Sequence, residues 1–220
     1  MKVAAAAHEP QILFTEENVR LIYSGEKIET RRIMKNQPPP GSSFEFADGV
    51  WWRMFDGSAQ STNIRCPYGR VGDTLWVRET WQLLHQVDGR IECWLRKTHG
   101  KIPKKKPEGW SVVYRAEHPE HVASTVTWRP NLFMPRWACR LLLRVEGLRA
   151  ERLHDITDEG ARAEGMPDVG AYRNLWDEIN SDRLAWASNP WIWVVRFSRI
   201  TEEHDARARN EAIQADAVCP

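Results

Sequence analysis

The chain has 220 residues, with 31 basic and 30 acidic side chains and 42% hydrophobic residues. This composition excludes a collagenous, low-complexity or wholly disordered protein, and the length favours one domain with a sizeable core. A net charge of +1 gives no global field that concentrates nucleic acid, so such binding would need a local patch. The 12 tryptophans and the excess of arginine over lysine suit either an all-β core or a surface that stacks bases and binds phosphates.

The four cysteines are far apart and form no C-x-x-C pair; they are Cys66, Cys93, Cys139 and Cys219. This spacing argues against a zinc knuckle and against a secreted disulfide framework. The opening MKVAAAAHEP is too short an apolar run for a signal peptide, and no stretch reaches the ~18 apolar residues of a membrane helix. We therefore expect a cytoplasmic monomer that does not bind membranes.

The first elements predicted along the chain are a strand, a helix and a second strand. The strand covers residues 11–14, and Thr15 then caps a helix whose apolar residues share one face. Gly25 ends this helix because glycine readily adopts the left-handed conformation that follows a helix. The second strand covers residues 28–33.

Asp-Gly dipeptides at 48–49 and 88–89 predict two hairpins in the middle of the chain. Between them a strand is expected over residues 74–81, where alternate side chains point to opposite faces. Glu79 then shares a face with apolar neighbours, which is unusual for a carboxylate.

The second half of the chain begins with a basic, proline-containing loop at residues 98–109. Residues 138–153 are long enough for a bent or bulged strand pair. Thr157 then caps a short helix, and a second helix covers about 171–180. The final strand covers residues 191–200.

These elements describe an α+β, mainly β, fold with short helices. We expect residues 1–10 to form a flexible N-terminus and residues 11–200 to form one domain. Residues 201–220 have little to bury, which predicts a frayed helix or a disordered tail.

The sequence lacks the common catalytic motifs, including the nucleophile elbow, the Walker loop and the zinc-protease helix. His118 and His121 are the closest pair of histidines, but Pro119 lies between them and no third ligand is evident. We therefore expect neither a metal nor a cofactor.

One group of residues after the first helix matches a family pattern. Gly25, Lys27, Thr30 and Arg32 meet the pattern G-x-K-x-x-T-x-R, and a V-G-D turn at 71–73 leads into a later strand. This arrangement resembles the ASCH family of PUA-like small β-barrels. The tryptophan-rich form is similar to ASCH proteins that phages and prophages encode.

The resemblance extends over most of residues 11–200. The helix that carries Glu164 looks like the family's helix with a functional glutamate, and 191–200 looks like its closing strand. The resemblance implies a PUA-like small mixed β-barrel flanked by short α-helices. The chain departs from the smallest members through insertions at 36–66 and 83–117.

The smallest characterised members of that family are bacterial amidohydrolases that remove the acyl group from N4-acetylcytidine. Carried over residue by residue, their lysine, threonine and glutamate correspond to Lys27, Thr30 and Glu164. The resemblance therefore implies hydrolysis of an amide bond, with Thr30 as nucleophile, Lys27 as base and Glu164 as acid.

Elementary chemistry sets conditions on this triad. Residues three apart in a regular strand face opposite sides, so Lys27 and Thr30 converge only if the chain turns or bulges between them. A lysine becomes a base near neutral pH only if burial lowers its pKa from ~10.4 towards ~7 to 8. Glu164 lies at a helix end where the macrodipole disfavours negative charge, which suits an acid that protonates a leaving amine.

Other residues are candidates for binding the substrate. We expect Trp52 or Trp81 to stack on the base and Arg32 to help place it. Glu79 either belongs to the pocket, where it would hold the base, or pairs with an arginine such as Arg136.

Two function classes follow from these residues. The first is an amidohydrolase that acts on a modified nucleoside. The alternative is a non-catalytic PUA-like reader of RNA or of a modified base, in which loop lysines contact phosphates, namely Lys101, Lys104, Lys105 and Lys106. Ribonuclease activity, which some ASCH relatives suggest, is a third. Salt separates the first two, because an RNA reader loses affinity steeply with salt and a nucleoside hydrolase hardly responds.

Overall fold

A computed structural model describes residues 9–39, 41–47, 50–55, 58–87, 90–94, 100–118 and 126–201. The strands are β1 (Gln11–Leu13), β2 (Glu29–Ile33), β3 (Ser43–Ala47), β4 (Val50–Phe55), β5 (Ser58–Ile64), β6 (Thr74–Arg78), β7 (Trp81–Val87), β8 (Arg90–Cys93), β9 (Ser111–Tyr114), β10 (Leu142–Arg152) and β11 (Trp191–Arg199). The α-helices are α1 (Glu16–Ser24), α4 (Asp158–Ala163) and α5 (Val169–Leu184). Short 3-10 turns cover Arg115–Glu117, Asn131–Phe133, Arg136–Ala138, Leu153–Asp155 and Trp186–Ser188.

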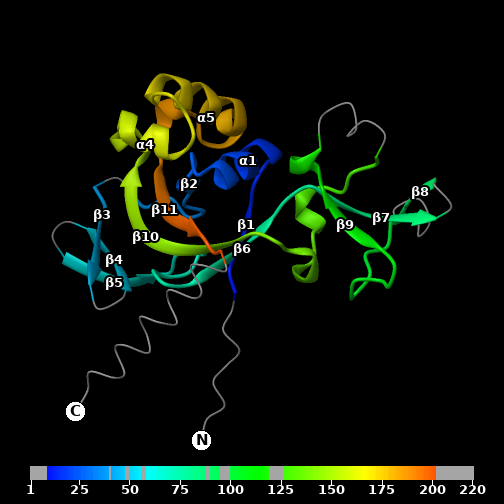
Figure 1. The fold of residues 1–220 in the computed structure, drawn as a ribbon. Coiled ribbons are helices and arrows are strands. Elements are labelled where there is room, and N and C mark those ends of the chain that lie inside the picture. The colour runs from blue at the N-terminus through cyan, green and yellow to red at the C-terminus, as the bar shows by residue number, and fades with distance from the viewer. Residues whose placement is uncertain are drawn as a thin grey trace, which may run out of the picture.

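A five-stranded mixed sheet forms the centre of the molecule, in the order β1-β6-β10-β11-β2 (Figure 1). β1 pairs with β6 in parallel, and the other neighbours are antiparallel. The structure is thus mostly sheet with few helices, which confirms the α+β class. In the described residues β1 and β2 are the two edges of this sheet, and they are not paired with each other.

The helix that separates these two edge strands has the predicted caps. The Thr15 hydroxyl accepts a hydrogen bond from the Asn18 backbone N–H at 3.3 Å, which satisfies a donor at the start of α1. Gly25 follows the helix with φ +82°, a left-handed conformation that glycine adopts without strain. Local sequence therefore fixes where the chain leaves β1 and enters β2.

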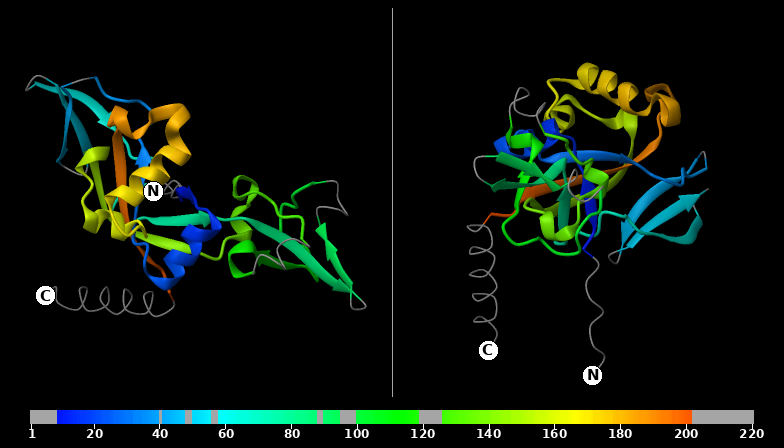
Figure 2. Two further views of the ribbon diagram at one scale, coloured as in Figure 1. Left: turned by 90° about the horizontal axis from the view of Figure 1, so that it is seen from above. Right: turned by 90° about the vertical axis from the view of Figure 1, so that its right-hand side faces the viewer.

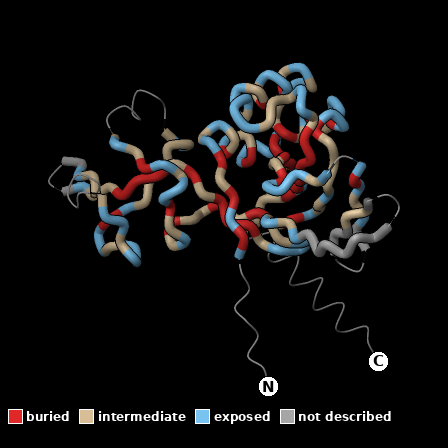
Figure 3. Tube along the Cα trace, turned by 180° about the vertical axis from the view of Figure 1, so that it is seen from behind, coloured by how far each residue is buried: buried red, intermediate tan, exposed pale blue. Residues whose placement is uncertain are grey.

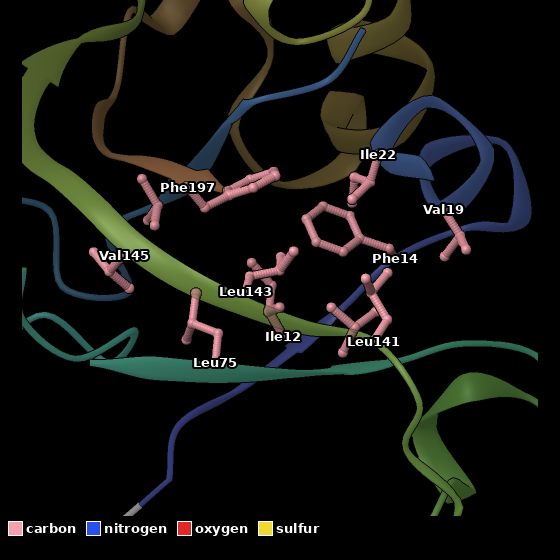
Figure 4. Close-up of a cluster of buried hydrophobic side chains, with 11 residues drawn as sticks. Ile12, Phe14, Val19, Ile22, Leu75, Leu141, Leu143, Val145 and Phe197 are labelled. Carbon is pink, nitrogen blue, oxygen red and sulfur yellow. The ribbon is translucent and has the colours of Figure 1, made fainter. Parts of the chain in front are cut away.

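The main core lies between α1 and one face of the central sheet (Figure 4). Phe14, Ile22 and Phe197 meet in its upper part, and aliphatic residues of β6 and β10 fill the rest, including Leu75 and Leu143. The rings of Phe14 and Phe197 lie 6.0 Å apart. Figure 3 shows the buried stretches concentrated in the strands of this central region.

The opposite face of β11 packs against the α4–α5 pair. Ile192 and Val194 point to a second cluster that contains Tyr172 and Trp176 of α5, whereas Phe197 points to the main core. Period-two alternation along β11 thus buries both faces of this strand. The helices α4 and α5 lie together at one end of the molecule (Figure 1).

Two further antiparallel sheets lie within the expected insertions. The order β3-β4-β5 falls inside residues 36–66, and the order β8-β7-β9 falls almost wholly inside 83–117. The latter sheet has its own apolar cluster and extends away from α4 and α5 (Figures 1 and 2). Each insertion therefore forms sheet structure instead of an irregular loop.

Several predicted elements differ in their limits. The strand expected over 74–81 is interrupted at Glu79 and Thr80, because β6 ends at Arg78 and β7 begins at Trp81. The expected strand pair at 138–153 is the single strand β10, and a bulge between Val145 and Gly147 supplies its bend. Sequence analysis missed β5, although Asp56-Gly57 is a turn dipeptide like the other two.

The ends of the chain lie largely outside the described residues. Residues 1–8 of the expected flexible N-terminus and 202–220 of the expected tail are among those not described. Pro10 belongs to the body of the protein, because it is buried and its carbonyl accepts a hydrogen bond from the Trp76 N–H at 3.1 Å. Within the described ranges, no helix combines the length and apolar composition that a membrane crossing requires.

Candidate functional site

A cavity of about 290 Å³ lies between β2, the end of α4 and one side of α5. It is lined by all three residues of the expected triad, Lys27, Thr30 and Glu164. Lys27 and Glu164 are 137 residues apart in sequence. The remaining lining residues are Asn18, Arg31, Arg32, Ile33, Tyr68, Tyr172, Leu175, Trp176, Ile179, Asn180 and Arg183.

The junction between α1 and β2 brings Lys27 to this cavity. Lys27 lies outside the regular strand, where its backbone N–H donates to the Leu21 carbonyl at 3.0 Å and its backbone bridges to Glu164. The next residue, Ile28, donates to the Ala163 carbonyl at 2.9 Å. Because β2 begins only at Glu29, the strand alternation does not separate Lys27 from Thr30, and both line the cavity.

Helix α4 positions Glu164 at its C-terminal end. Thr157 caps the start of the helix through a hydrogen bond from the Gly160 N–H at 3.2 Å, as the sequence predicts. Gly165 follows with φ +83°, and a Cβ there would lie only 2.7 Å from Leu21 Cδ1. The left-handed backbone conformation favours glycine at this position, and any larger residue would also have to displace the end of the Leu21 side chain.

Lys27 and Glu164 form a buried ion pair. Lys27 Nζ donates to the Glu164 carboxylate and also to the Glu164 backbone carbonyl, the latter at 2.8 Å. The second carboxylate oxygen accepts the backbone N–H of Arg31. Both side chains are almost completely buried, with 3% and 6% of their surfaces exposed. The pair thus has the hydrogen bonds that buried charges require.

Burial lowers the pKa of Lys27 from its ordinary value of 10.5. The Glu164 carboxylate opposes this effect, and the Arg32 and Arg31 guanidinium groups reinforce it. The direction is the one that a lysine base needs, because a lower pKa increases the neutral fraction at a given pH.

Thr30 completes the triad on β2, where it lies opposite Val195 of β11. It is 4% exposed, and within the described part of the chain its hydroxyl has no hydrogen-bond partner. A buried hydroxyl that lines a cavity and lacks a partner is available to a bound molecule.

Arg31 joins the site to a set of buried carboxylates. Its guanidinium lies 2.9 Å from Glu29, 3.4 Å from Glu151 and 3.7 Å from Glu164. Arg149 in turn makes two hydrogen bonds of 2.9 Å to Glu29. Charges of alternating sign therefore run from Arg149, which is 44% exposed, to the buried Lys27.

Arg32 lies on the same face of β2 as Thr30 and spans the gap between the two sheet edges. Its Nη2 donates to the Leu13 carbonyl at 2.7 Å, and its guanidinium lies 5.2 Å from the centre of the Phe14 ring. Its Nε is buried and has no hydrogen-bond partner. Arg32 thus lines the cavity together with the triad.

Aromatic walls come from residues that sequence analysis did not assign to the site. Tyr68, Tyr172 and Trp176 line the cavity. Burial, with a further contribution from Glu164, raises the pKa of Tyr172 well above 10. The apolar stripe predicted for the second helix contains Tyr172 and Trp176, but such a stripe is equally typical of a core, so it gave no specific signal.

Three of the other expected binding residues, Trp81, Glu79 and Arg136, are not among those that line this cavity. Trp81 is fully buried in the cluster beside β7, edge-on to Trp137 at 5.7 Å, so its ring has no free face for a base. The side chain of Trp52, in β4, lies outside the described residues. Glu79 and Arg136 are the remaining two.

Glu79 follows the ion-pair alternative, although with a different partner from the one suggested. It makes two hydrogen bonds of 2.9 Å to Arg140, whereas Arg136 pairs with Glu9 at 2.6 Å. Arginine has the planar fork that satisfies both oxygens of a buried carboxylate, and Arg140 reaches Glu79 from the segment before β10.

The basic loop is exposed, as predicted, at Lys101, Lys104, Lys105 and Lys106. It belongs to the insertion that contains β8 and β9, away from α4 and α5 (Figures 1 and 2). Side chains from elsewhere anchor its backbone: Trp94 donates to the Lys101 carbonyl at 2.8 Å and Trp137 to the Pro103 carbonyl at 3.1 Å.

Among the described residues, no group of three His, Cys, Asp or Glu side chains is arranged to hold a metal ion. Comparisons of the chain with protein-family models, with curated proteins and with solved structures give no match.

The charge chain behind the site leads to a prediction about stability. Burial alone would raise the pKa of Glu29, but the Arg149 and Arg31 guanidinium groups outweigh it and hold the pKa below 4.5. Glu29→Gln should lower the free energy of unfolding by about 3 kcal/mol at pH 7, because it removes the buried carboxylate that Arg31 and Arg149 share and leaves Glu151 between them. Urea unfolding measures this change.

The pH dependence has a defined sign. The pairing stabilises the native protein above the unfolded pKa of Glu29, and this stabilisation is lost as the pH falls through the lower native pKa. The difference between wild type and Glu29→Gln should therefore shrink towards pH ~3. Glu26→Gln is the matched control, since Glu26 is exposed and accepts only the Ser24 hydroxyl. If the difference in unfolding free energy between wild type and Glu29→Gln stayed constant with pH, the pairing of ionised Glu29 with the two arginines would be contradicted.

Proposed function

We propose that this protein is an amidohydrolase that removes the acyl group from N4-acylated cytosine nucleosides. The observation that carries the proposal is the convergence of Lys27, Thr30 and Glu164 on one cavity. Two of these residues are held in contact from opposite ends of the chain, while the hydroxyl of the third is left without a partner. Members of the ASCH family, which the sequence resembles, use the same three residue types for this reaction.

The buried ion pair can supply both a base and an acid. Moving one proton from Lys27 to Glu164 converts the charged pair into a neutral amine and a neutral carboxylic acid. A poorly solvated site favours this neutral form more than water does, because burial penalises charge. In that form Lys27 accepts a proton while Glu164 donates one.

Acylation of Thr30 would then proceed as follows. The Thr30 oxygen attacks the amide carbonyl and gives its proton to neutral Lys27. Glu164 protonates the N4 nitrogen, the C–N bond breaks, and cytidine leaves with its amino group. This step ends with an acyl ester on Thr30, a Lys27 ammonium and a Glu164 carboxylate.

Hydrolysis of the ester reverses the two roles. Glu164 takes a proton from water as the water attacks the ester carbonyl. The Thr30 oxygen leaves and recovers its proton from the Lys27 ammonium. The free acid departs, and the pair returns to its starting state with one shared proton.

The cavity dimensions agree with a small substrate. About 290 Å³ is at the lower end of the range of roughly 300 to 1,000 Å³ for ligand pockets. Tyr68 and Trp176 offer aromatic surface beside the base, and the unpartnered Arg32 Nε offers a donor. These residues replace the expected Trp52 and Trp81 in the proposal.

The proposal also covers the fold family of the protein, its cellular compartment and its oligomeric state. The central sheet, with α1 between its edge strands and Arg32 across the gap between them, supports a PUA-like barrel of the ASCH type. We also propose a cytoplasmic monomer that uses no cofactor.

Thr30 variants test the nucleophile. Thr30→Ala should abolish hydrolysis of N4-acetylcytidine, because the variant lacks the attacking oxygen, whereas Thr30→Ser should retain part of the activity. Glu164→Gln should lower kcat by at least ~10²-fold, since a positioned proton donor typically contributes that much. The hydrolysis rates are measured from the amount of cytidine released over time, which is quantified by chromatography.

Circular dichroism serves as the folding control for each variant, and Thr80→Ala serves as a matched threonine change outside the cavity. Turnover by Thr30→Ala at the wild-type rate would remove Thr30 as nucleophile. Binding of N4-acetylcytidine without hydrolysis by the wild type would favour the reader instead.

The shared proton predicts a bell-shaped dependence of kcat/KM on pH. Activity falls at low pH when the pair takes up a second proton, and at high pH when it loses its last proton. Because burial lowers the pKa of Lys27, the alkaline limb should have its midpoint below 10.5.

Glu164→Gln provides a sharp comparison for this profile. In this variant Glu164 cannot take the proton from Lys27, so only the lysine that solution pH has already deprotonated can act as a base. The residual activity should therefore rise as the pH increases through the pKa of Lys27, instead of falling. Lys27→Arg should be inactive at every pH, because arginine keeps its charge. The same alkaline limb in wild type and in Glu164→Gln would contradict the shared-proton mechanism.

The exposed lysine loop separates hydrolase from RNA reader. Replacing Lys104, Lys105 and Lys106 together with glutamine should leave turnover of free nucleoside within about threefold, because the loop lies away from the cavity. Steady-state kinetics with N4-acetylcytidine measures this. RNA binding by the wild type that falls steeply with salt and is lost in this variant would support the reader.

A further inference from the structure

A second hollow adjoins the candidate catalytic cavity. It has a volume of about 360 Å³ and lies between α1 and α5. The two spaces share Asn18, Leu175 and Ile179 as lining residues. The hollow is therefore the immediate neighbour of the cavity that the triad lines, with these three residues between the two spaces.

The shared wall is unusually apolar for an exposed helix face. Ile179 is 65% exposed and Leu175 is half-buried, although both lie on the α5 stripe that the sequence assigns to the core. Met166 adds a third apolar side chain to the lining of the hollow. Burying such side chains against an apolar ligand is favourable, and in the described residues the protein itself leaves Ile179 uncovered.

The positions of these residues indicate which part of a substrate would enter. Tyr68 and Arg32, which suit a base, line the cavity but not the hollow. Met166, two residues after Glu164, lines the hollow but not the cavity. The residues that suit a base are thus confined to the cavity, and Met166 belongs to the hollow alone.

The rim of the hollow carries negative charge. Glu17 and Glu178 both line it, and no ion pair of either is found in the described residues. Glu16 also lines it but is paired with Arg115 at 2.8 Å. Arg20 is the one basic residue among the described residues of the lining; its Nε donates to the Ala116 carbonyl at 2.9 Å, and the two remaining carboxylates outnumber it. Carboxylates at the rim repel a second carboxylate, so this charge selects against acyl groups that end in an acid.

We propose that the hollow is an acyl-chain subsite, which selects N4-acylcytosines with unbranched apolar acyl groups longer than acetyl. The inference rests on the proposed function and specifies its substrate class. The ligand is the chain of a fatty acyl group such as butanoyl or hexanoyl, with the leading methylenes against Leu175 and Ile179.

The test compares kcat/KM of the full-length protein for four compounds, N4-acetyl-, N4-butanoyl-, N4-hexanoyl- and N4-succinylcytidine. Each added methylene that enters the hollow should raise kcat/KM by about fourfold, from the free energy of burying one methylene. Succinyl should react at least tenfold more slowly than butanoyl, because its carboxylate faces the acidic rim.

Two sets of variants locate the effect. Ile179→Asp should bring the hexanoyl-to-acetyl ratio towards one, whereas Leu132→Asp, at another exposed apolar position, should leave the ratio unchanged. Replacing Glu17 and Glu178 together with lysine should raise the succinyl-to-butanoyl ratio. Both changes are at surface residues, and the ratios do not depend on the fraction of folded protein.

The outcomes separate the subsite from the activity. Hydrolysis of acetylcytidine with no gain along the chain-length series would overturn the acyl subsite and leave the proposed function standing. A gain that Ile179→Asp does not change would also overturn it, because the chain would then bind elsewhere. No hydrolysis of any of the four compounds would overturn the proposed function and the subsite together.

Discussion

The buried contact between Lys27 and Glu164 is the constraint on which the site depends. Two charges removed from water require hydrogen bonds on nearly every polar atom, and the backbone supplies them here through the Glu164 carbonyl and the Arg31 N–H. Those bonds fix the end of α4 against the start of β2. The residue after Glu164, Gly165, has a left-handed backbone and lies against Leu21 of α1. Packing of α1, α4 and β2 thus follows from the need to satisfy one ion pair.

The same pair explains the charged residues on the helix-facing side of the sheet. Arg31 supports Glu164, but a buried arginine needs more negative charge than one shared carboxylate provides, and Glu29 and Glu151 provide it. Glu29 is in turn balanced by Arg149 at the surface. Each charged side chain therefore lies beside one of opposite sign. The free-energy cost of removing charge from water is shared by several groups and is not confined to Lys27 and Glu164.

Local signals made much of the fold predictable, whereas the pocket depends on contacts between distant segments. Thr15, Gly25 and Thr157 act within a few residues of themselves, so the sequence indicates the helix ends correctly. The triad was accessible only because a motif resembles a family. Nothing near Glu79 in sequence reveals that Arg140 is its partner, and nothing near Trp81 reveals that a separate sheet encloses it. Propensity and periodicity report burial, but they do not report which of several buried surfaces faces a cavity.

The distance in sequence between the two halves of the site has a consequence for folding. Thr30 lies in β2 and Lys27 just before it, and among the described strands β11 is the one that pairs with β2. The closure of this long loop is entropically costly and occurs only when most of the sheet has formed. A chain without β11 in place has no organised triad, however much helix it contains. Organisation of this cavity during refolding therefore reports the pairing of β2 with β11.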